Sequence, residues 1–292
     1  MIKDWLLNML RCPDSGESLT LSADGQHLAS GTLTFAVDDD IPSFITRQED
    51  KTHFDYTAHY TADAEEFDYF SEESDKLTAL HLKLLRTLVM NQAPASATLL
   101  LDVGCGSAFV AQHFCKQGKN VVSMDIAYAN AHKAIERFPL PIHAAVVADA
   151  YHLPFADGTF DCIIASEIIE HTIDPQGFAA SLLTKLKPGG TLIISTPYKE
   201  QIAYSLCIHC NCKTPHNAHL HSFDENKIRK IFSTLPAKIK GMRLVGNKLL
   251  LHSHLSVLLS HLGIKVWGCC DSIANRLIPK ANHFIITIQK EA

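Results

Sequence analysis

Apolar runs and helical patterns alternate along the chain from about residue 97 onward. Runs rich in aliphatic residues predict five buried strands, at residues 98–106, 120–127, 141–150, 160–169 and 189–197. The segments between them, such as 109–117 and 178–186, space their apolar residues as helices do. Two later runs, 238–245 and 283–289, predict a sixth and a seventh strand. Such alternation predicts βαβ units, and therefore an α/β fold with a mostly parallel sheet.

Residues 1–93 follow a different pattern, which predicts two further segments before the main domain at 94–292. Residues 1–46 contain a short helical pattern, a break at Cys12–Gly16 and strand-like runs at 18–21 and 32–37, which predict a small β-rich module. Residues 47–93 place leucines at helical spacing and predict a linker or lid of one or two helices. The aromatic side chains of this linker either pack it onto the core or cover a ligand pocket; they are Phe54, Tyr56, Tyr60, Phe67, Tyr69 and Phe70.

Composition excludes several classes of protein. The chain is 47% hydrophobic and 20% charged, which excludes wholesale disorder, and its net charge of −5 argues against a strongly basic nucleic-acid surface. No apolar run approaches the ~20 residues of a membrane-spanning helix. The N-terminus carries Asp4 early and has no small-residue cleavage site, so it does not read as a signal peptide. We therefore expect a cytoplasmic protein that has neither a membrane nor a nucleic acid as its partner.

A glycine-rich turn follows the first predicted strand of the main domain. Gly104 and Gly106 allow a sharp turn that approaches a ligand closely, and the next helix presents free N–H groups there. Asp102 precedes the glycines and suits an ammonium group. Asp125 ends the second strand, where a carboxylate can accept both ribose hydroxyls, and Asp149 ends the third, where it can accept an exocyclic amine. Each aspartate alone could also serve as a cap or turn residue.

In this order, the motifs resemble the S-adenosylmethionine-dependent methyltransferases of the seven-stranded Rossmann-like type. The resemblance covers about residues 95–292 and rests on LDVGCGSAFV, MDIA, ADAYHLPFADGTFDCIIASEIIEH and LKPGGTLIIST. It implies S-adenosylmethionine as cofactor and a doubly wound seven-stranded sheet, mostly parallel with one antiparallel strand. Ala108 stands where the family has its third glycine. The cofactor-binding residues implied are Asp102, Gly104, Cys105, Gly106, Asp125, Ile126, Asp149, Ala150 and Ser166.

The N-terminal module has a resemblance of its own. The segments LRCPDSGESL and GTLTFAVDDDIPSFI are similar to the small zinc ribbon of the methyltransferase-activator family. That family has a C-P-x-C pair, but here Ser15 replaces the second cysteine after Cys12. We therefore expect a degenerate ribbon that has lost its metal and is held by its own apolar residues and by docking on the rest of the chain.

A dense group of cysteines and histidines occupies an insertion at residues 199–222. Cys207 and Cys210 have the C-x-x-C spacing at which two thiolates reach one zinc, and His219 and His221 follow. The segment resembles a zinc-bearing insertion found after strand five in some small-molecule methyltransferases. Structural zinc is the favoured interpretation; a substrate-facing histidine cluster and a metal-free polar loop are the alternatives. Whether Cys212 or His216 is a ligand stays open.

The function expected is methyl transfer from S-adenosylmethionine to a small-molecule acceptor, with the two held in line. Candidate catalytic residues are His171, Tyr198 and His216. The sequence lacks the Asn/Asp-Pro-Pro-Tyr tetrad that related families use to methylate base or glutamine nitrogens. An RNA or protein methyltransferase and a non-catalytic cofactor-binding or activator protein are the alternatives. A homodimer is left open.

Overall fold

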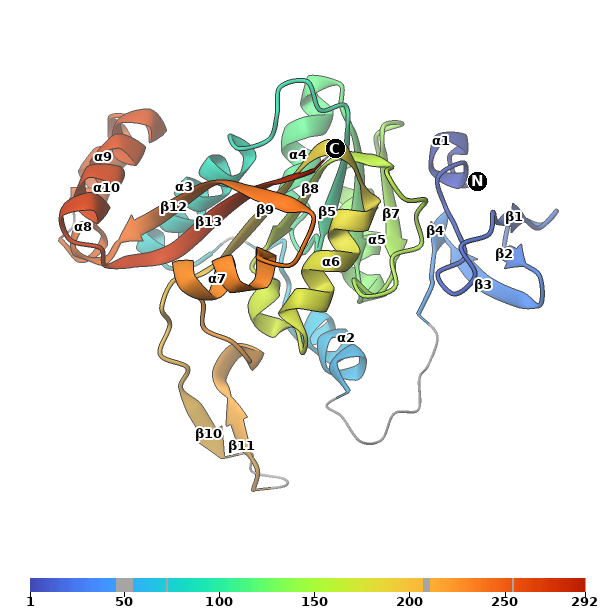
Figure 1. The fold of residues 1–292 in the computed structure, drawn as a ribbon, viewed down its shortest axis with the longest axis horizontal. Coiled ribbons are helices and arrows are strands. Elements are labelled where there is room, and N and C mark those ends of the chain that lie inside the picture. The colour runs from blue at the N-terminus through green and yellow to red at the C-terminus, as the bar shows by residue number, and fades with distance from the viewer. Residues whose placement is uncertain (46–54, 72, 207–210, 254, 292) are drawn as a thin grey trace. The chain divides into compact units, whose positions relative to one another are not determined.

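The computed structural model describes residues 1–45, 55–71, 73–206, 211–253 and 255–291 (Figure 1). Cys207 and Cys210 lie outside this part of the chain. The chain divides into two compact units. Unit 1 contains residues 1–71, 95–164 and 181–190, and unit 2 contains residues 72–94, 165–180 and 191–292.

The main sheet has seven strands in the order β12-β13-β9-β8-β5-β6-β7. Its strands are β5 (Leu99–Val103), β6 (Asn120–Asp125), β7 (His143–Val147), β8 (Phe160–Ser166), β9 (Leu186–Pro197), β12 (Ala237–Asn247) and β13 (Ala281–Lys290). Strands β5, β6 and β7 pair in parallel, whereas β13 runs antiparallel to both β12 and β9. The predicted doubly wound, mostly parallel sheet is confirmed. The aliphatic runs of β5, β6, β7 and β8 form strands whose side chains are buried on both faces of the sheet, whereas most of β12 is half-buried or exposed.

Helices of both units lie between the strands, as the alternating pattern predicts. Helices α2 (Tyr56–Glu66) and α3 (Lys76–Met90) form the expected helical linker; Asp55 and Asp75 cap them by accepting from the amides of Ala58 and Thr78. The other α-helices that follow in the described part of the chain are α4 (Phe109–Phe114), α5 (Tyr128–Arg137), α6 (Pro175–Lys185), α7 (Glu225–Phe232), α8 (Lys248–His252), α9 (Leu255–His261) and α10 (Ile264–Leu277). A short hairpin, β10 (Tyr204–Leu206) and β11 (Lys213–Pro215), extends from unit 2 (Figure 1).

The N-terminal module of unit 1 consists of helix α1 (Asp4–Leu7) and a four-stranded antiparallel sheet. Its strands are β1 (Thr20–Leu21), β2 (His27–Ser30), β3 (Leu33–Asp38) and β4 (Ile41–Pro42). The predicted runs at 18–21 and 32–37 correspond to β1 and β3. Strand β2 has no apolar run of its own and was not predicted; it forms because Leu28 pairs with Phe35 of β3 and both are buried.

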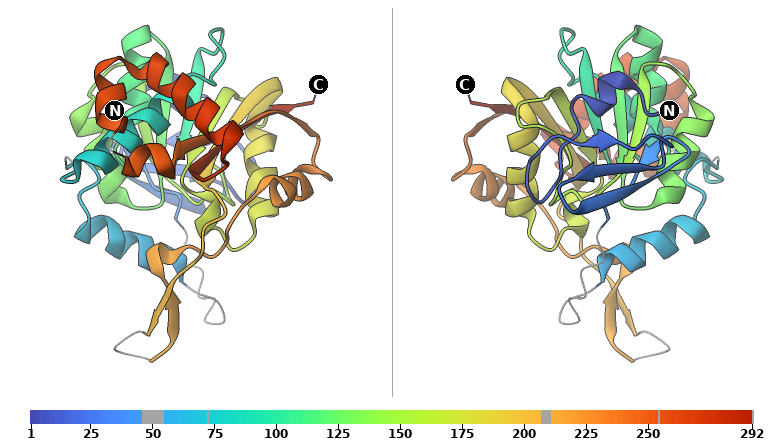
Figure 2. Two further views of the ribbon diagram at one scale, coloured as in Figure 1. Left: turned by 90° about the vertical axis from the view of Figure 1, so that its left-hand side faces the viewer. Right: turned by 90° about the vertical axis from the view of Figure 1, so that its right-hand side faces the viewer.

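This module docks on the rest of unit 1 along strand β7 (Figure 2, right). Ser43 forms a parallel bridge with Val147, and the amide of Phe44 donates to the Val147 carbonyl at 2.8 Å. Ile41 packs in one apolar cluster with Ala131, Ala145 and Val147. The module therefore shares an apolar cluster with the rest of unit 1; the loss of a metal from it stays a prediction.

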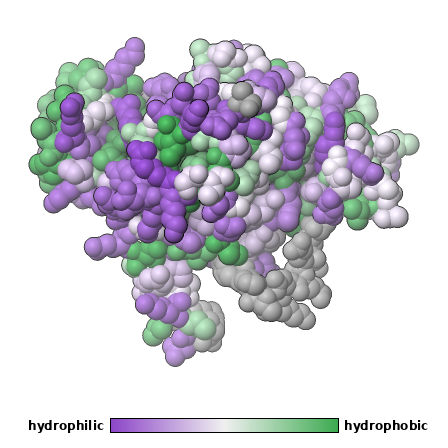
Figure 3. All heavy atoms as spheres, in the orientation of Figure 1, coloured by the Kyte–Doolittle hydropathy of each residue, from purple (hydrophilic) through white to green (hydrophobic). Residues whose placement is uncertain are grey.

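Helices α8, α9 and α10 of unit 2 expose several large apolar side chains. Hydrophobic residues gather over them at the left of the space-filling view (Figure 3). The most exposed are Leu258, Leu262, Ile273 and Leu277. None of the helices within the described ranges is both long enough and apolar enough to cross a bilayer.

Candidate functional site

The glycine turn of unit 1 lies directly after β5 and is anchored on β6. The amides of Gly104 and Cys105 donate to the Met124 carbonyl at 2.8 and 3.0 Å. Gly104 has φ 68° and Gly106 has φ 41°, in the left-handed region that glycine enters without a Cβ clash. The backbone thus adopts the tight turn that the sequence predicts for close approach to a ligand.

Ala108 occupies the third position of this turn and is also left-handed, with φ 51° and ψ 34°. A non-glycine residue in this conformation costs about 1–2 kcal/mol. Ala108 is fully buried at the start of α4, so packing of its methyl group offsets part of that cost. The alanine therefore keeps the conformation of the glycine that it replaces.

Asp125 joins the end of β6 to the glycine turn. Its Oδ1 accepts from the Ala127 amide at 3.0 Å, and its Oδ2 accepts from the Gly106 amide at 3.3 Å. Burial raises the pKa of this carboxyl even though the backbone amides oppose the rise. Asp102, also buried, lies at the end of β5. The two acidic side chains thus bracket the turn, as the cofactor assignment requires.

Aromatic residues of the linker reach the same turn. The Tyr56 hydroxyl donates to Asp149 Oδ2, beyond the end of β7. Tyr69 lies over Gly106: a Cβ on that glycine would be 3.8 Å from the Tyr69 ring. The Tyr69 hydroxyl donates to Asp63, and burial with this contact raises the pKa of Tyr69. Tyr56 thus lies against the end of β7 and Tyr69 against the glycine turn; that they cover a ligand stays a prediction.

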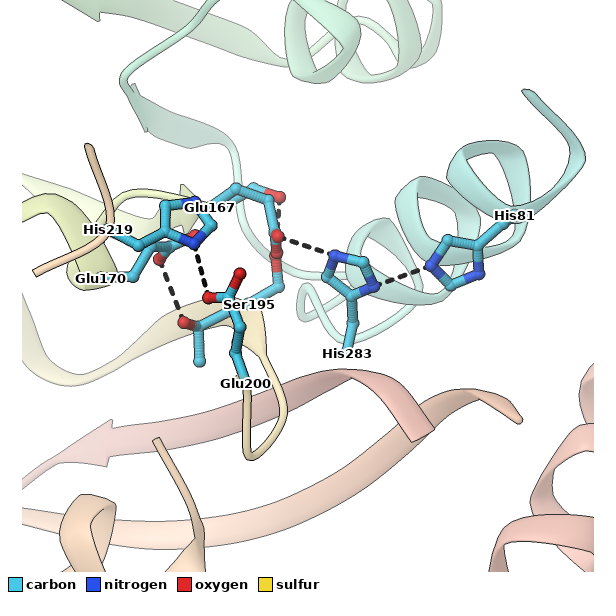
Figure 4. A network of polar contacts seen from close by, with 9 residues as sticks. His81, Glu167, Glu170, Ser195, Glu200, His219 and His283 are labelled. Atoms are coloured by element: carbon cyan, nitrogen blue, oxygen red, sulfur yellow. Dashed lines mark hydrogen bonds and ion pairs between the residues drawn. The ribbon is translucent and has the colours of Figure 1, made fainter. Parts of the chain in front are cut away.

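A second polar site lies in unit 2, around Glu167 (Figure 4). Its Oε1 accepts from the Ser195 hydroxyl at 2.7 Å, and its Oε2 pairs with His283 Nε2 at 2.9 Å. His283 Nδ1 lies 2.7 Å from Nε2 of His81 on α3. Burial acts to raise the pKa of Glu167, but the charge and hydrogen bond of His283 together with the hydrogen bond from Ser195 and the charge of His81 outweigh burial, so the pKa is lowered. Ser166, expected at the cofactor, lies 2.7 Å from Ser195 in this same network.

Glu167 is held in a strained backbone conformation, with φ 59°. Its amide donates to the Ser195 carbonyl at 2.9 Å, which fixes the turn after β8 against β9. Strain of this kind costs about 1–3 kcal/mol and is concentrated at functional sites. The strained turn directs a carboxylate toward His283.

The predicted catalytic and metal residues lie at several places in unit 2. Tyr198 donates to Glu225 of α7 at 2.9 Å, and burial raises the pKa of Tyr198. His216 lies on the exposed hairpin and bonds to Ser205. His171 contacts His219, with ring centroids 4.8 Å apart. His221 packs instead on Phe223, with ring centroids 5.9 Å apart. Because Cys207 and Cys210 lie outside the described residues, the four-ligand zinc set stays a prediction.

Sequence reasoning did not identify His81, His283 or Ser195 as site residues. His81 stands 202 positions from His283, and each reads as an isolated histidine among apolar neighbours. Ser195 did carry a signal, because it lies in the polar stretch that ends the fifth predicted strand. The pairing itself depends on tertiary structure that no local pattern encodes.

Comparisons with known proteins agree with this architecture. Residues 101–194 match the model of a methyltransferase domain. The ubiquinone biosynthesis O-methyltransferase of Homo sapiens, a mitochondrial protein, is 33% identical over 133 residues, which cover 43% of this chain and 36% of that protein. The enzyme of the same name from Ralstonia nicotianae is 29% identical over 168 residues, 52% of this chain and 69% of that protein. The match thus spans about a third of the human relative.

Among solved structures, the 1,6-didemethyltoxoflavin-N1-methyltransferase of Burkholderia thailandensis, with 1,6-didemethyltoxoflavin and S-adenosylhomocysteine bound, has a TM-score of 0.54 at 14% identity. The alignment covers 93% of this chain and 98% of that one. A complex of the Haloferax volcanii Trm112 methyltransferase activator with a putative methyltransferase has a TM-score of 0.53 at 14% identity, over 82% of this chain. At these identities the likeness concerns the fold. Residues 101–194 are thus similar to a methyltransferase domain, and the chain has the Rossmann-like fold of methyltransferases of known structure.

Proposed function

We propose that this protein transfers a methyl group from S-adenosylmethionine to a small-molecule acceptor. The observation that carries the proposal is the glycine turn whose Gly106 amide donates to Asp125. At this turn the backbone can approach a ligand closely, and the neighbouring carboxylate can accept hydrogen bonds from the ribose hydroxyls of the cofactor. In this proposal Asp149, which accepts a hydrogen bond from Tyr56, binds the adenine of the cofactor, and Asp102 binds its amino group.

We propose an oxygen atom as the acceptor, in line with the names of the O-methyltransferases that the chain resembles. Glu167 accepts the hydrogen bond of the acceptor hydroxyl, because its carboxylate is held negative by His283 and oriented by Ser195. As the oxygen–methyl bond forms and the sulfur–methyl bond breaks, the hydroxyl proton passes to Glu167 and S-adenosylhomocysteine is left. Positioning and this proton transfer are the contributions of the protein.

Two measurements test the proposal. Calorimetry with S-adenosylmethionine and S-adenosylhomocysteine should show one site per chain. Methyl-labelled cofactor, incubated with a panel of phenols and enols, should then give labelled ethers. Cofactor binding without labelled product from any panel would favour a non-catalytic binding or activator protein. Label in RNA or protein, with salt-dependent RNA retention, would favour the macromolecular methyltransferase.

Other expectations stay predictions beside this function. The N-terminal module is proposed to be a degenerate ribbon of the activator type, since Cys12 is buried and Ser15 occupies the second ligand position. Structural zinc at Cys207, Cys210, His219 and His221 is to be tested by elemental analysis. A homodimer is to be tested by sedimentation; exposed apolar residues of α9 and α10 are candidates for its interface. Cytoplasmic localisation is likewise a prediction.

A further inference from the structure

A histidine lies on the buried face of helix α3 in unit 2, among apolar side chains. His81 is 6% exposed. The other buried side chains of the helix are Leu84, Leu85, Leu88 and Val89. A buried imidazole is costly unless its polar atoms are hydrogen-bonded. Nε2 of His81 lies 2.7 Å from Nδ1 of His283 on β13, and through this contact the ring joins the Glu167 network (Figure 4).

Strand β12 makes room for the His81 ring at Gly246. A Cβ on Gly246 would lie 2.5 Å from Nδ1 of His81 and closer still to Cε1, so a larger residue there would displace the ring. Gly246 has φ 74°, in the region that glycine favours, and its amide donates to Asp271 Oδ2 of α10 at 3.1 Å. The strand is thus fixed by α10 at the point where it contacts the imidazole.

The positions of the protons in this network follow from its two ends. The Glu167 carboxylate can only accept, so Nε2 of His283, 2.9 Å from Oε2, carries an N–H. At the other end, Nδ1 of His81 is buried and has no hydrogen-bond partner among the described residues. Burial lowers the pKa of His81 to about 4, so at neutral pH this ring carries one proton.

That proton has two possible positions on His81. On Nδ1 it would form a buried N–H without an acceptor, a group that is rarer in protein interiors than an unpaired acceptor. On Nε2 it points at Nδ1 of His283 and is hydrogen-bonded. The second arrangement is therefore favoured, and it requires a lone pair on Nδ1 of His283. Since a neutral imidazole carries one proton, the proton of His283 is then on Nε2, facing Glu167.

We propose that His81 is a positioning residue for Glu167 and acts through His283. By donating to Nδ1 of His283, it holds the His283 proton on the nitrogen that donates to the carboxylate. Without this donor the His283 proton can move to Nδ1, and the lone pair on Nε2 would then face the carboxylate and repel it. The inference rests on the proposed function, in which Glu167 takes the acceptor proton, and it makes that step depend on helix α3.

The first measurement needs neither cofactor nor acceptor. Long-range proton–nitrogen correlation spectra of protein with isotope-labelled histidines report which ring nitrogen carries the proton, and the signals lost in His283→Gln assign His283. In wild type the His283 proton should be on Nε2. His81→Leu removes the donor, so the form with the proton on Nδ1 should become populated. His81→Gln has an amide that can donate, and it should keep the wild-type form.

The second measurement separates positioning from packing. With a phenol that wild type methylates, kcat should fall at least about fivefold in His81→Leu, the effect of one hydrogen bond, and stay within about twofold of wild type in His81→Gln. KM for the phenol should change little, because His81 acts through His283 rather than on the acceptor. Leu84→Val is the control: it shortens an apolar side chain on the same buried face and leaves the donor in place, so the tautomer and kcat should stay as in wild type.

Gly246→Ala tests the same link from strand β12. The added methyl group should push the His81 ring away from His283 without removing a polar group, so the tautomer and kcat should change as in His81→Leu. Circular dichroism checks the fold of each variant, and the two His81 variants decide if Gly246→Ala does not fold.

Three outcomes overturn the proposal. The first is a wild-type His283 with its proton on Nδ1 or on both nitrogens, the second is an unchanged tautomer in His81→Leu, and the third is the same kcat in His81→Leu and His81→Gln. Failure of the proposed function is distinguishable, because wild type would then methylate no phenol while the spectra still decide the proton positions.

Discussion

Tyr56 donates a hydrogen bond to Asp149 and so links helix α2 to the end of strand β7. A carboxylate has about four lone-pair sites, so Asp149 can accept from Tyr56 and from an adenine amine together. The bond joins residues 93 positions apart in the chain. In the proposed function, helix α2 would cover the cofactor, held by the same carboxylate that binds the adenine amine.

Replacing Tyr56 with Phe should loosen this cover. The variant keeps the ring and loses only the hydroxyl, so we expect the cofactor to dissociate faster and its Kd to rise several-fold, about 1 kcal/mol for one hydrogen bond. Stopped-flow displacement of S-adenosylhomocysteine measures the dissociation rate. A rate equal to that of wild type would show that Tyr56 has no part in retaining the cofactor.

Asp125→Ala should weaken S-adenosylmethionine binding by about 1–3 kcal/mol, because charge-assisted hydrogen bonds to the ribose are lost. Calorimetry gives the affinity directly. Asp157→Ala is the matched control, since that carboxylate is exposed and pairs with Lys185 at the surface. Unchanged affinity in the Asp125 variant would remove the ribose assignment.

Glu167→Gln should lower kcat of methyl transfer at least about tenfold, because a neutral amide cannot take the acceptor proton. The affinity for S-adenosylmethionine should stay as in wild type, since the cofactor turn belongs to unit 1. Single-turnover transfer and calorimetry on the same preparation measure the two quantities. Full activity in this variant would exclude Glu167 as the proton acceptor.

The stability of the fold should fall below about pH 6.5 because of buried histidines. Burial lowers the pKa of His143 to about 4, and His81 behaves alike. His143 Nδ1 donates to the Phe138 carbonyl and its Nε2 accepts from Ser123, so the neutral ring is fully bonded. Between pH 6.5 and 4 the unfolded chain binds the proton and the native chain does not. Each group therefore removes up to about 1.4 kcal/mol per pH unit as the pH falls.

Urea unfolding of wild type and His143→Gln between pH 7.5 and pH 4.5 tests this effect. In the variant the unfolding free energy should depend less steeply on pH, by about the amount that one titrating proton contributes. His261→Gln, a change at an exposed histidine, serves as control. An identical slope in wild type and the His143 variant would contradict the assignment.

Ile41→Ala should destabilise the protein by about 2–5 kcal/mol, the usual cost of emptying a buried aliphatic site. Ile41 is 1% exposed and packs on Ala145 and Val147, so the loss is felt at the junction of module and core. Chemical denaturation measures the change, with Leu33→Ala on the exposed edge as control. A loss below about 0.5 kcal/mol would mean that the module is not docked through Ile41.

The strands of the main sheet could be predicted because each is a separate aliphatic run that ends at a polar turn. The tight glycine turn after β5 could be predicted equally well, because it depends on residues beside one strand. The ribose role of Asp125 stays a prediction. Strand β2 could not be predicted from its own residues, because its burial comes from pairing with β3.

The polar site in unit 2 was the part of the chain that was hardest to predict from the sequence. Glu167, Ser195 and His283 come from three separate strand ends, and His81 from a helix. Histidine and glutamate are ordinary surface residues, so only their convergence gives them meaning. The Cys/His context predicted His219 as a zinc ligand, which stays a prediction; its neighbours in the structure are His171 and Glu200.

The bridge between Ser43 and Val147 has a consequence for how the protein behaves at high concentration. Strand β7 ends the seven-stranded order, so without the N-terminal module its outer N–H and C=O groups would be open to another chain. The module therefore covers the end of β7 and hinders pairing of this edge with a strand of another chain. A chain truncated before residue 47 should polymerise through that edge, even though the cofactor turn and the polar network of unit 2 are both still present.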